Sequence, residues 1–204
     1  MLSKKSILLL LVTVSLVFSN LLWAHNPEFS SIIISKTENG QIVLQLNSSL
    51  TAFQQEINYI HGEGAYKSPE EFQELVLQLF RSRFFFILNN NDTLQFKNPK
   101  VILGHETKII AEIIDLPLKT KSIELRNEIF YDLYNSQSAV IFSLNEFPKT
   151  KYTLNKENLN TINVSLEDGK WIDNNSKSTK KSLTYLPFVL TFIIGGLLFF
   201  LIKK

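Results

Sequence analysis

The 204-residue chain has no cysteine, one methionine and only seven glycines. Without cysteine it can form no disulfide bond, no zinc–thiolate site, no iron–sulfur cluster and no cysteine nucleophile. The low glycine content excludes a collagen-like chain, and a hydrophobic content of 45% argues against intrinsic disorder. The sequence therefore predicts a folded chain that does not rely on disulfides.

A clustered basic region is also missing from the middle of the chain. Four of the 21 basic residues lie in the two end segments, whereas all 19 acidic residues lie between these segments: the four are Lys4, Lys5, Lys203 and Lys204. The middle of the chain therefore carries a slight excess of negative charge. Nucleic-acid-binding domains show the opposite pattern, so we expect no nucleic-acid partner.

Residues 1–24 have the pattern of a secretory signal peptide. A short basic start, with Lys4 and Lys5, precedes an uncharged and mainly apolar run. Ala24 suits the last position before a cleavage site, although Leu22, two positions earlier, is larger than usual. We expect cleavage after Ala24, and an uncleaved signal anchor is the alternative. Cleavage would make His25 the first residue of the mature chain.

Residues 183–202 predict a transmembrane helix. This run of 20 residues carries no charge, and 20 helical residues span about 30 Å, the thickness of the hydrocarbon core of a bilayer. The basic residues 203–204 then form a short cytoplasmic tail. The polar stretch at residues 173–182 predicts a flexible stalk. We therefore expect a single-pass protein of the cell membrane, with residues 25–172 as one domain outside the cytoplasm.

The start of this domain predicts a β-hairpin and then a helix. Residues 31–36 and 41–47 flank a turn at Asn39-Gly40, and the second run alternates polar and apolar side chains. After an expected loop at residues 59–67, Ser68 has the character of an N-cap that begins a capping box, with Pro69 as the first helical residue. Apolar residues then follow at helical spacing: Phe72, Leu75, Val76, Leu79 and Phe80. We expect this helix to cover one face of a sheet.

The remainder of the domain reads as short strands separated by turns. The expected strands are residues 84–88, 94–96, 101–103, 108–114, 122–130, 138–144, 151–154 and 160–164. Short strands with frequent turns are typical of a sandwich. The predicted fold is mainly β: an antiparallel β-sandwich-like ectodomain with one covering α-helix, plus a C-terminal transmembrane helix.

The three histidines are the only residues that suggest a metal site. An N-terminal His25 would offer a free amine and an imidazole nitrogen, which suits Cu(II), and His61 or His105 could add a further nitrogen. The alternative is that His25 merely follows the cleavage site on a frayed terminus, because no spacing forces the three histidines together. We therefore assign copper or nickel only as a speculative ligand of His25, His61 and His105.

No catalytic signature is present. The sequence has neither the G-x-S-x-G nor the H-E-x-x-H pattern, so we assign no catalytic residue and no cofactor-binding residue. The run Phe84-Phe85-Phe86 fits a ligand or lipid platform, but a buried strand after the helix explains it better.

One segment carries a resemblance to known proteins. Residues 126–133 (RNEIFYDL), followed by Ser136-Gln137, join the terminal His25, the first hairpin and the Ser68 helix in a layout that resembles a family of secreted bacterial β-rich domains of unknown function. The layout is similar, more distantly, to the extracytoplasmic N-terminal domain of HupE/UreJ-type membrane proteins, over most of residues 25–165. Those proteins are linked to nickel or cobalt handling through a membrane part with several spans. This chain has one predicted span, so the resemblance implies no transport by this chain alone.

From the sequence we expect a non-enzymatic accessory or binding module of the bacterial cell envelope. Its partners would be the lipid bilayer and another membrane or envelope protein. The first alternative is a copper- or nickel-binding module that uses His25. The second is a membrane-tethered hydrolase, because the members of a Ser/His/Asp triad can lie far apart along a chain.

Overall fold

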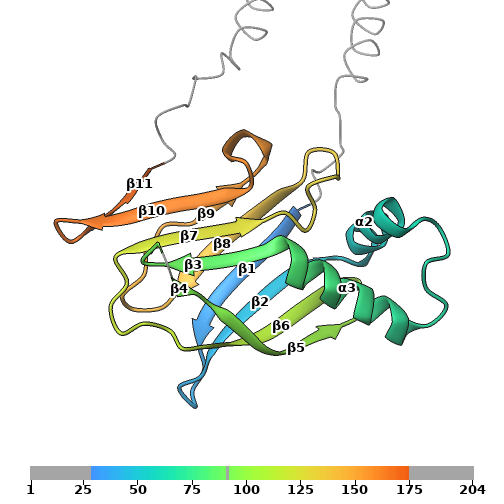
Figure 1. The fold of residues 1–204 in the computed structure, drawn as a ribbon, viewed down its shortest axis with the longest axis horizontal. Coiled ribbons are helices and arrows are strands. Elements are labelled where there is room, and N and C mark those ends of the chain that lie inside the picture. Colours follow the sequence, from blue (N-terminus) through green and yellow to red (C-terminus); the bar gives the residue numbers. More distant parts are fainter. Residues whose placement is uncertain (1–28, 91, 175–204) are drawn as a thin grey trace, which may run out of the picture. The chain divides into compact units, whose positions relative to one another are not determined.

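A computed structural model of the chain describes residues 29–90 and 92–174 (Figure 1). The predicted signal peptide, His25, the predicted transmembrane helix and most of the predicted stalk lie outside these residues. Within the part of the chain that the structure describes, none of the helices has both the length and the apolar character needed to span a bilayer.

Six strands form the larger sheet, in the order β5-β6-β2-β1-β8-β9. Neighbouring strands are antiparallel except β1 and β8, which pair in parallel, from Phe29 opposite Gln137 to Ser35 opposite Ser143. The expectation of an antiparallel fold is therefore wrong at this pair, where the hundred residues between the two strands provide the long crossover that parallel pairing requires. The strands are β1 (Phe29–Lys36), β2 (Ile42–Ser49), β5 (Gln95–Ile102), β6 (Glu106–Ile114), β8 (Gln137–Ser143) and β9 (Tyr152–Leu154).

Five strands form the smaller sheet, in the order β11-β10-β7-β3-β4, and every pairing in it is antiparallel. Its edge strand β11 was not predicted, and Asp173, expected to begin the stalk, is the last residue of this strand. The strands are β3 (Phe84–Leu88), β4 (Asp92–Thr93), β7 (Ser122–Asn127), β10 (Thr161–Glu167) and β11 (Lys170–Asp173).

The predicted hairpin and the predicted helix are both confirmed. Strands β1 and β2 pair around the turn that contains Gly40, whose φ of 84° favours glycine. Helix α3 (Pro69–Arg83) begins after Ser68, whose Oγ accepts a hydrogen bond from the backbone N–H of Glu71 at 3.2 Å. The Glu71 carboxylate accepts a hydrogen bond from the N–H of Lys67 at 2.6 Å, one residue before the N-cap. Both bonds satisfy backbone donors at or beside the helix start.

A second helix, α2 (Leu50–His61), corrects the expectation of one covering helix. The Ser49 side chain caps it by accepting a hydrogen bond from the N–H of Ala52 at 3.0 Å, and Phe53 and Ile57 are fully buried on its inner face. The helix follows β2 without a turn, so no Gly or Pro marks the change from strand to helix. This lack of a boundary explains why the segment was missed.

Two predicted strands join into the single strand β5. The register between β5 and β6 shifts between Lys97 and Lys100, which is a bulge at Asn98-Pro99. Asn98 has a φ of 50°, which asparagine tolerates well, and Pro99 lies on an edge strand, where its missing N–H costs no ladder hydrogen bond. Asn98-Pro99, which was expected to separate two strands, is therefore a bulge within one strand.

Both sheets and both helices contribute to one hydrophobic core. In the predicted strand β3, Phe84 and Phe86 are buried and Phe85 is half-buried, so the phenylalanine run is a strand with one face in the core. The ring of Phe86 lies 6.1 Å from that of Phe142 on β8, which joins the two sheets. The domain is therefore mainly β, with two sheets around a shared core, and this fits the sandwich-like expectation.

Candidate functional site

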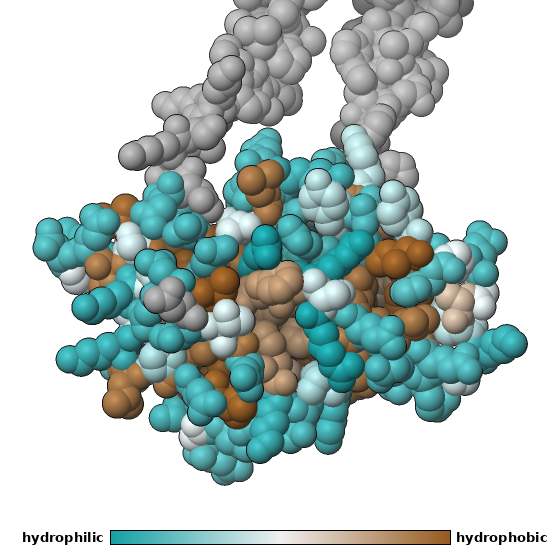
Figure 2. All heavy atoms as spheres, in the orientation of Figure 1, coloured by the Kyte–Doolittle hydropathy of each residue, from teal (hydrophilic) through white to brown (hydrophobic). Residues whose placement is uncertain are grey.

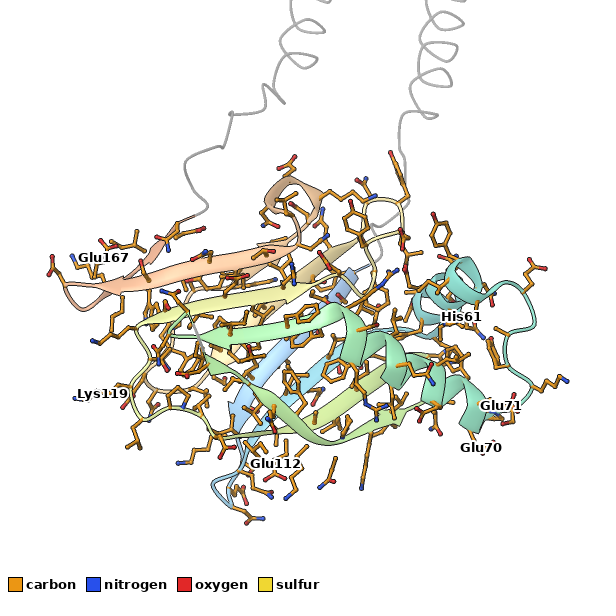
Figure 3. All side chains as sticks on the ribbon, viewed as in Figure 1. His61, Glu70, Glu71, Glu112, Lys119 and Glu167 are labelled. Carbon is orange, nitrogen blue, oxygen red and sulfur yellow. The ribbon has the colours of Figure 1, made fainter. Side chains whose placement is uncertain are left out.

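The structure places His61 and His105 at opposite ends of helix α2. His61 is the last residue of the helix and is exposed (Figure 3), whereas the carbonyl oxygen of His105 accepts a hydrogen bond from the N–H of Leu50, the first helical residue, at 3.1 Å. Twelve helical residues are about 18 Å long, so the helix separates the two imidazoles. His25 lies outside the described residues.

No group of three or more His, Asp or Glu residues that could hold a metal ion occurs within residues 29–90 and 92–174. The metal hypothesis depends on His25 and stays a prediction. Over the same residues, neither His61 nor His105 is hydrogen-bonded to a serine through its side chain, as a Ser/His/Asp triad would require. The hydrolase hypothesis also stays untested.

A buried cluster of charged side chains joins α2, α3 and the connection between β7 and β8. Nη1 of Arg83, the last residue of α3, donates hydrogen bonds to Oε1 of Glu56 at 2.6 Å and to Oδ2 of Asp132 at 2.9 Å. The Glu56 side chain is fully buried, whereas those of Arg83 and Asp132 are partly exposed. One arginine therefore bridges two carboxyl groups from different elements.

The pKa of Glu56 is raised from 4.5 to about 8; burial is the largest cause, and the neighbouring Asp132 carboxyl acts in the same direction. The positive charge of Arg83 acts in the opposite direction but does not outweigh them. Glu56 therefore keeps its proton at neutral pH. The remaining oxygen, Oε2, is buried and has no hydrogen-bond partner among the described residues, so a negative charge on this carboxyl would be poorly compensated.

This cluster is structural. Because Glu56 has no exposed surface, a dissolved substrate cannot reach it directly. The segment that follows β7 is held to the same helix end by a backbone bond, since the N–H of Glu128 donates to the carbonyl of Arg83 at 2.9 Å. The charged cluster therefore fixes the residue 127–132 segment against both helices.

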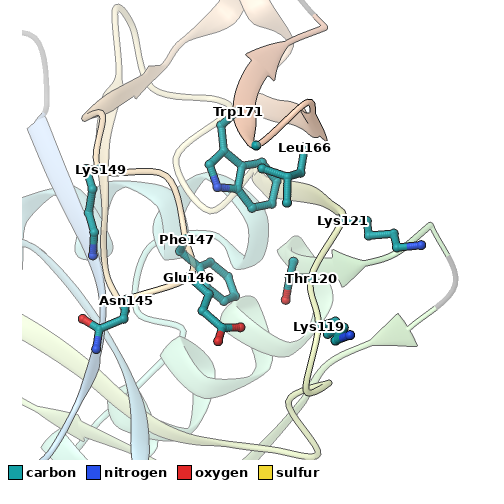
Figure 4. Close-up of a pocket in the computed structure, with 10 residues that line it drawn as sticks. Lys119, Thr120, Lys121, Asn145, Glu146, Phe147, Lys149, Leu166 and Trp171 are labelled. Atoms are coloured by element: carbon teal, nitrogen blue, oxygen red, sulfur yellow. The ribbon is translucent and has the colours of Figure 1, made fainter.

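The strongest candidate for a ligand site is a pocket of about 520 Å³ at one end of the domain (Figure 4). Three connections form it: the β6–β7 loop, the β8–β9 loop and the β10–β11 hairpin. Its volume lies within the usual range of small-molecule sites, about 300–1,000 Å³. The lining residues are Lys119, Thr120, Lys121, Asn145, Glu146, Phe147, Lys149, Leu166, Gly169 and Trp171.

An aromatic wall faces polar groups across this pocket. Figure 4 shows the indole ring of Trp171 on one side, with Glu146 and Thr120 across from it and the Lys121 side chain directed away. Phe147 is buried beneath. The pocket therefore combines a flat apolar surface with a carboxylate, a hydroxyl, an amide and ammonium groups close by.

Hydrogen bonds hold the walls of the pocket in place. The side chain of Asn89 accepts a bond from the N–H of Lys121 at 2.8 Å and donates one to the carbonyl of Lys119 at 3.1 Å. The Lys149 ammonium donates to the carbonyl of Leu144 at 2.7 Å, which closes the β8–β9 loop. Gly169, with a φ of 77°, occupies the tight turn that returns the chain to Trp171. The pocket is therefore preformed by the backbone.

A second hollow, of about 410 Å³, lies between α3, β3 and β5 and is lined mainly by aromatic rings, including Phe80, Phe84 and Phe96. Figure 2 shows apolar side chains gathered at the centre of the drawn face, with polar side chains around them. The rings of Phe80 and Phe84 stack at 5.3 Å, and both rings belong to the buried core. This hollow is therefore the exposed edge of core packing.

Few local patterns in the sequence point to either the cluster or the pocket. Arg81 and Arg83 both lie in the last turn of α3, but Arg81 pairs at the surface with Glu74 at 3.4 Å, whereas Arg83 turns inward to Glu56. Trp171 was not singled out, because the short strand that carries it was not predicted. A lone tryptophan just after the Asp168-Gly169 turn was the available signal.

No protein-family model matches this chain, and no curated protein matches its sequence. The resemblance to secreted β-rich domains and to HupE/UreJ-type proteins therefore stays a prediction. The function must be argued from the residues themselves.

Proposed function

We propose that this chain is a membrane-anchored, extracytoplasmic binding module of the cell envelope, and that its ligand site is the pocket beside Trp171. The end segments support the anchoring: residues 1–24 have the pattern of an export signal, and residues 183–202 have the length and composition of a membrane span. The pocket supports the binding role, because surface loops on a rigid scaffold commonly carry binding sites. The module acts without catalysis and together with a membrane or envelope partner.

The observation that carries the ligand class is the indole of Trp171 set opposite mixed polar groups. The C–H face of a sugar ring packs against a flat aromatic ring, while its hydroxyl groups need both donors and acceptors around the rim. Glu146 and Asn145 supply acceptors, and Lys119 and Asn145 supply donors. A saccharide of the cell envelope matches this combination.

Trp171 also provides the experiment. The chain has two tryptophans, Trp23 and Trp171, and Trp23 lies in the segment that the signal peptide would remove. The emission of the mature protein then reports on Trp171 alone. We expect glucose, N-acetylglucosamine, galacturonate or their short oligomers to shift this emission saturably, and calorimetry to show the same binding curve.

A pair of variants separates pocket binding from nonspecific effects. Trp171→Ala should abolish calorimetric binding, whereas Ile172→Ala should retain it, because Ile172 is the next residue of β11 and points to the opposite face. If none of these saccharides changes the emission or produces heat, the saccharide assignment is wrong. Equal loss in both variants would also contradict it, because the loss would then follow from disruption of β11.

A second candidate function, copper binding, is favoured by a hollow of about 410 Å³ at the start of the described chain. His105 and Glu106 line it together with Phe29, and His25 lies only four residues before Phe29 in sequence. Ser48 also lines the hollow, and its buried hydroxyl has no hydrogen-bond partner among the residues that the structure describes. A mature terminus at His25 would bring an amine and an imidazole within reach of His105.

Cu(II) titration of correctly processed protein tests this second function. Removal of either proposed imidazole, in His25→Ala or His105→Ala, should weaken binding, whereas His61→Ala should leave it unchanged, because His61 lies at the other end of α2. Equal and weak binding by all four proteins would exclude the site. N-terminal sequencing must accompany the titration, since an unprocessed chain lacks the terminal amine of His25.

A further inference from the structure

Exposed apolar side chains gather at the end of the domain where the described chain begins. In Figure 1 the β7–β8 and β9–β10 connections lie at the same end as the start of β1. The parallel register places Phe29 beside Gln137, which lies three residues after Tyr134. Two lysine ammonium groups also make cation–π contacts with aromatic rings at this end. We call this surface the aromatic end and define it by Phe29, Tyr131, Tyr134, Lys151, Lys156 and Leu159.

The aromatic end is unusually exposed for its composition. The exposed fraction is 74% for both Tyr134 and Leu159, 51% for Phe29 and 49% for Tyr131. Single exposed apolar side chains are normal on protein surfaces, but several at one end indicate an interaction surface.

The backbone at Leu159 adds an independent observation. Leu159 has a φ of 54°, in the left-handed region, and the seven other non-glycine residues with positive φ in the described ranges are all asparagine or aspartate. A leucine in this conformation costs stability, and its side chain recovers little by burial because it remains exposed. Leucine at position 159 therefore keeps an apolar side chain on the surface although its backbone conformation is strained.

The chemistry of this end suits the interfacial region of a bilayer. The ammonium of Lys156 lies 5.6 Å from the ring centre of Tyr131, and that of Lys151 lies 5.7 Å from the ring centre of Phe29. Tyrosine places an apolar ring and a polar hydroxyl at headgroup depth, and lysine extends its charge toward anionic headgroups. The nearby carboxylate of Asp132 is already paired with Arg83.

The last strand directs the chain back toward the same end of the domain. In the register of β10 and β11, Glu167 pairs with Lys170 and Val164 with Asp173, so β11 runs toward the start of β10, close to Leu159. Nine residues lie between Asp173 and Leu183, where the predicted membrane span begins, so the two residues are at most about 35 Å apart. A domain anchored through residues 183–202 therefore stays within about 35 Å of the bilayer.

We propose that the aromatic end docks on the headgroup region of an anionic lipid bilayer, with Tyr134 and Leu159 entering the interface. This inference rests on the proposed membrane anchoring, but it adds a defined orientation of the domain. The domain then lies on the membrane, and the pocket beside Trp171 points away from it.

The lack of cysteine makes a direct test possible. Tyr134→Cys, Leu159→Cys and, as control, Leu118→Cys each provide one site for an environment-sensitive fluorophore in the full-length protein. Leu118 is 95% exposed and lies in the loop before β7, whereas Tyr131 and Tyr134 follow β7 at its other end. The labelled proteins are reconstituted in phosphatidylcholine vesicles with and without phosphatidylglycerol, and quenching by lipids brominated near the headgroup is measured.

We expect quenching of the labels in Y134C and L159C to exceed that in L118C by at least about threefold in the anionic vesicles, because interfacial side chains enter the bilayer by about 5–10 Å. Lys156→Glu should reduce this quenching in anionic vesicles and leave it nearly unchanged in neutral ones. Equal quenching at all three sites overturns the proposal, as does quenching confined to L118C.

Vesicle flotation distinguishes a failure of the proposed anchoring from a failure of the proposed docking. If the full-length protein does not float with vesicles, the anchoring in the proposed function is wrong. If it floats but the labels in Y134C and L159C remain in water, the anchoring stands and the docking of the aromatic end is wrong.

Discussion

Oε1 of Glu56 accepts a hydrogen bond from Nη1 of Arg83 at 2.6 Å, which joins the middle of α2 to the last residue of α3. The two residues are 27 positions apart in the sequence. Asp132 completes the cluster from the connection that follows β7. This cluster determines the pKa of Glu56, which the first two predictions concern.

The first prediction concerns the stability of the domain as pH rises. Folded Glu56 keeps its proton up to about pH 8, whereas the unfolded chain loses it near its ordinary pKa of 4.5. Between these values the folded state binds more protons, so the contribution of Glu56 to the free energy of unfolding falls as pH rises and levels off above about 8. Glu56→Gln introduces a neutral side chain of the same shape as the protonated carboxyl, so it should remove this dependence of stability on pH.

Urea denaturation between about pH 5 and pH 9 measures this dependence. The glutamine variant should equal wild type at the acidic end and exceed it at the basic end. Glu56→Ala is the contrasting variant: it leaves a cavity and removes the hydrogen bond between Glu56 and Arg83, so it should lose about 3–5 kcal/mol at the acidic end. The loss should shrink as pH rises, because wild type itself loses stability there. Parallel pH curves for wild type and the glutamine variant would show that Glu56 is ionised in the folded state.

The second prediction concerns the role of Asp132 in the titration of Glu56. The neighbouring carboxyl of Asp132 raises the pKa of Glu56, but burial is the larger cause. Asp132→Asn should therefore lower the pKa of Glu56 below about 8 while leaving it above 4.5. Carbon-13 NMR of the Glu56 carboxyl reports this directly, with the exposed Glu157→Gln as control. An unchanged midpoint in the Asp132 variant would leave burial and Arg83 as the only causes.

Local signals predicted the elements that carry their own boundaries. Ser68 and Pro69 predicted α3, and the Asn39-Gly40 turn with the alternating run at residues 41–47 predicted the first hairpin. These features act within a few residues, where side-chain capping and turn geometry decide the conformation. Most strand positions were accordingly close to those observed.

The missed features depend on contacts between residues far apart in the sequence. Helix α2 follows a strand without a breaker, the parallel β1–β8 pair joins distant segments, and the pairing of Glu56 with Arg83 needs both helices in place. No local pattern distinguishes Arg83 from Arg81, although only one of them turns inward. The candidate pocket was missed for the same reason, because three separate connections form it.

The third prediction concerns the Asn89 clamp on the pocket wall. Asn89→Ala removes two hydrogen bonds to the Lys119–Lys121 loop and places alanine at a φ of 51°. We expect a loss of about 1–3 kcal/mol in the free energy of unfolding and weaker saccharide binding. Asn90→Ala is the matched control, because Asn90 has a similar φ of 66° but only one side-chain bond, from Ser122. Equal losses in both variants would assign the effect to backbone strain alone.

The fourth prediction compares neighbouring phenylalanines of β3. Phe86 is fully buried and contacts Phe142 across the core, whereas Phe85 is half-buried and lies 4.6 Å beneath the guanidinium of Arg126. Phe86→Ala should cost about 3–5 kcal/mol, and Phe85→Ala should cost about 0.5–1 kcal/mol for the lost cation–π contact plus its partial burial. Similar losses in thermal or urea unfolding would contradict the assigned faces of β3.

The last prediction separates stability from membrane docking at Leu159. Its φ of 54° suits asparagine better than leucine, and the side chain is mostly exposed, so Leu159→Asn should stabilise the domain by about 1 kcal/mol. The same substitution removes an apolar group from the aromatic end, so it should weaken the association of this end with anionic vesicles. Urea denaturation measures the first effect, and quenching of the label in Y134C measures the second. A variant that is more stable and docks less well would show that leucine is kept at this position for contact with the bilayer and at a cost to the fold, whereas unchanged docking would remove Leu159 from the interface.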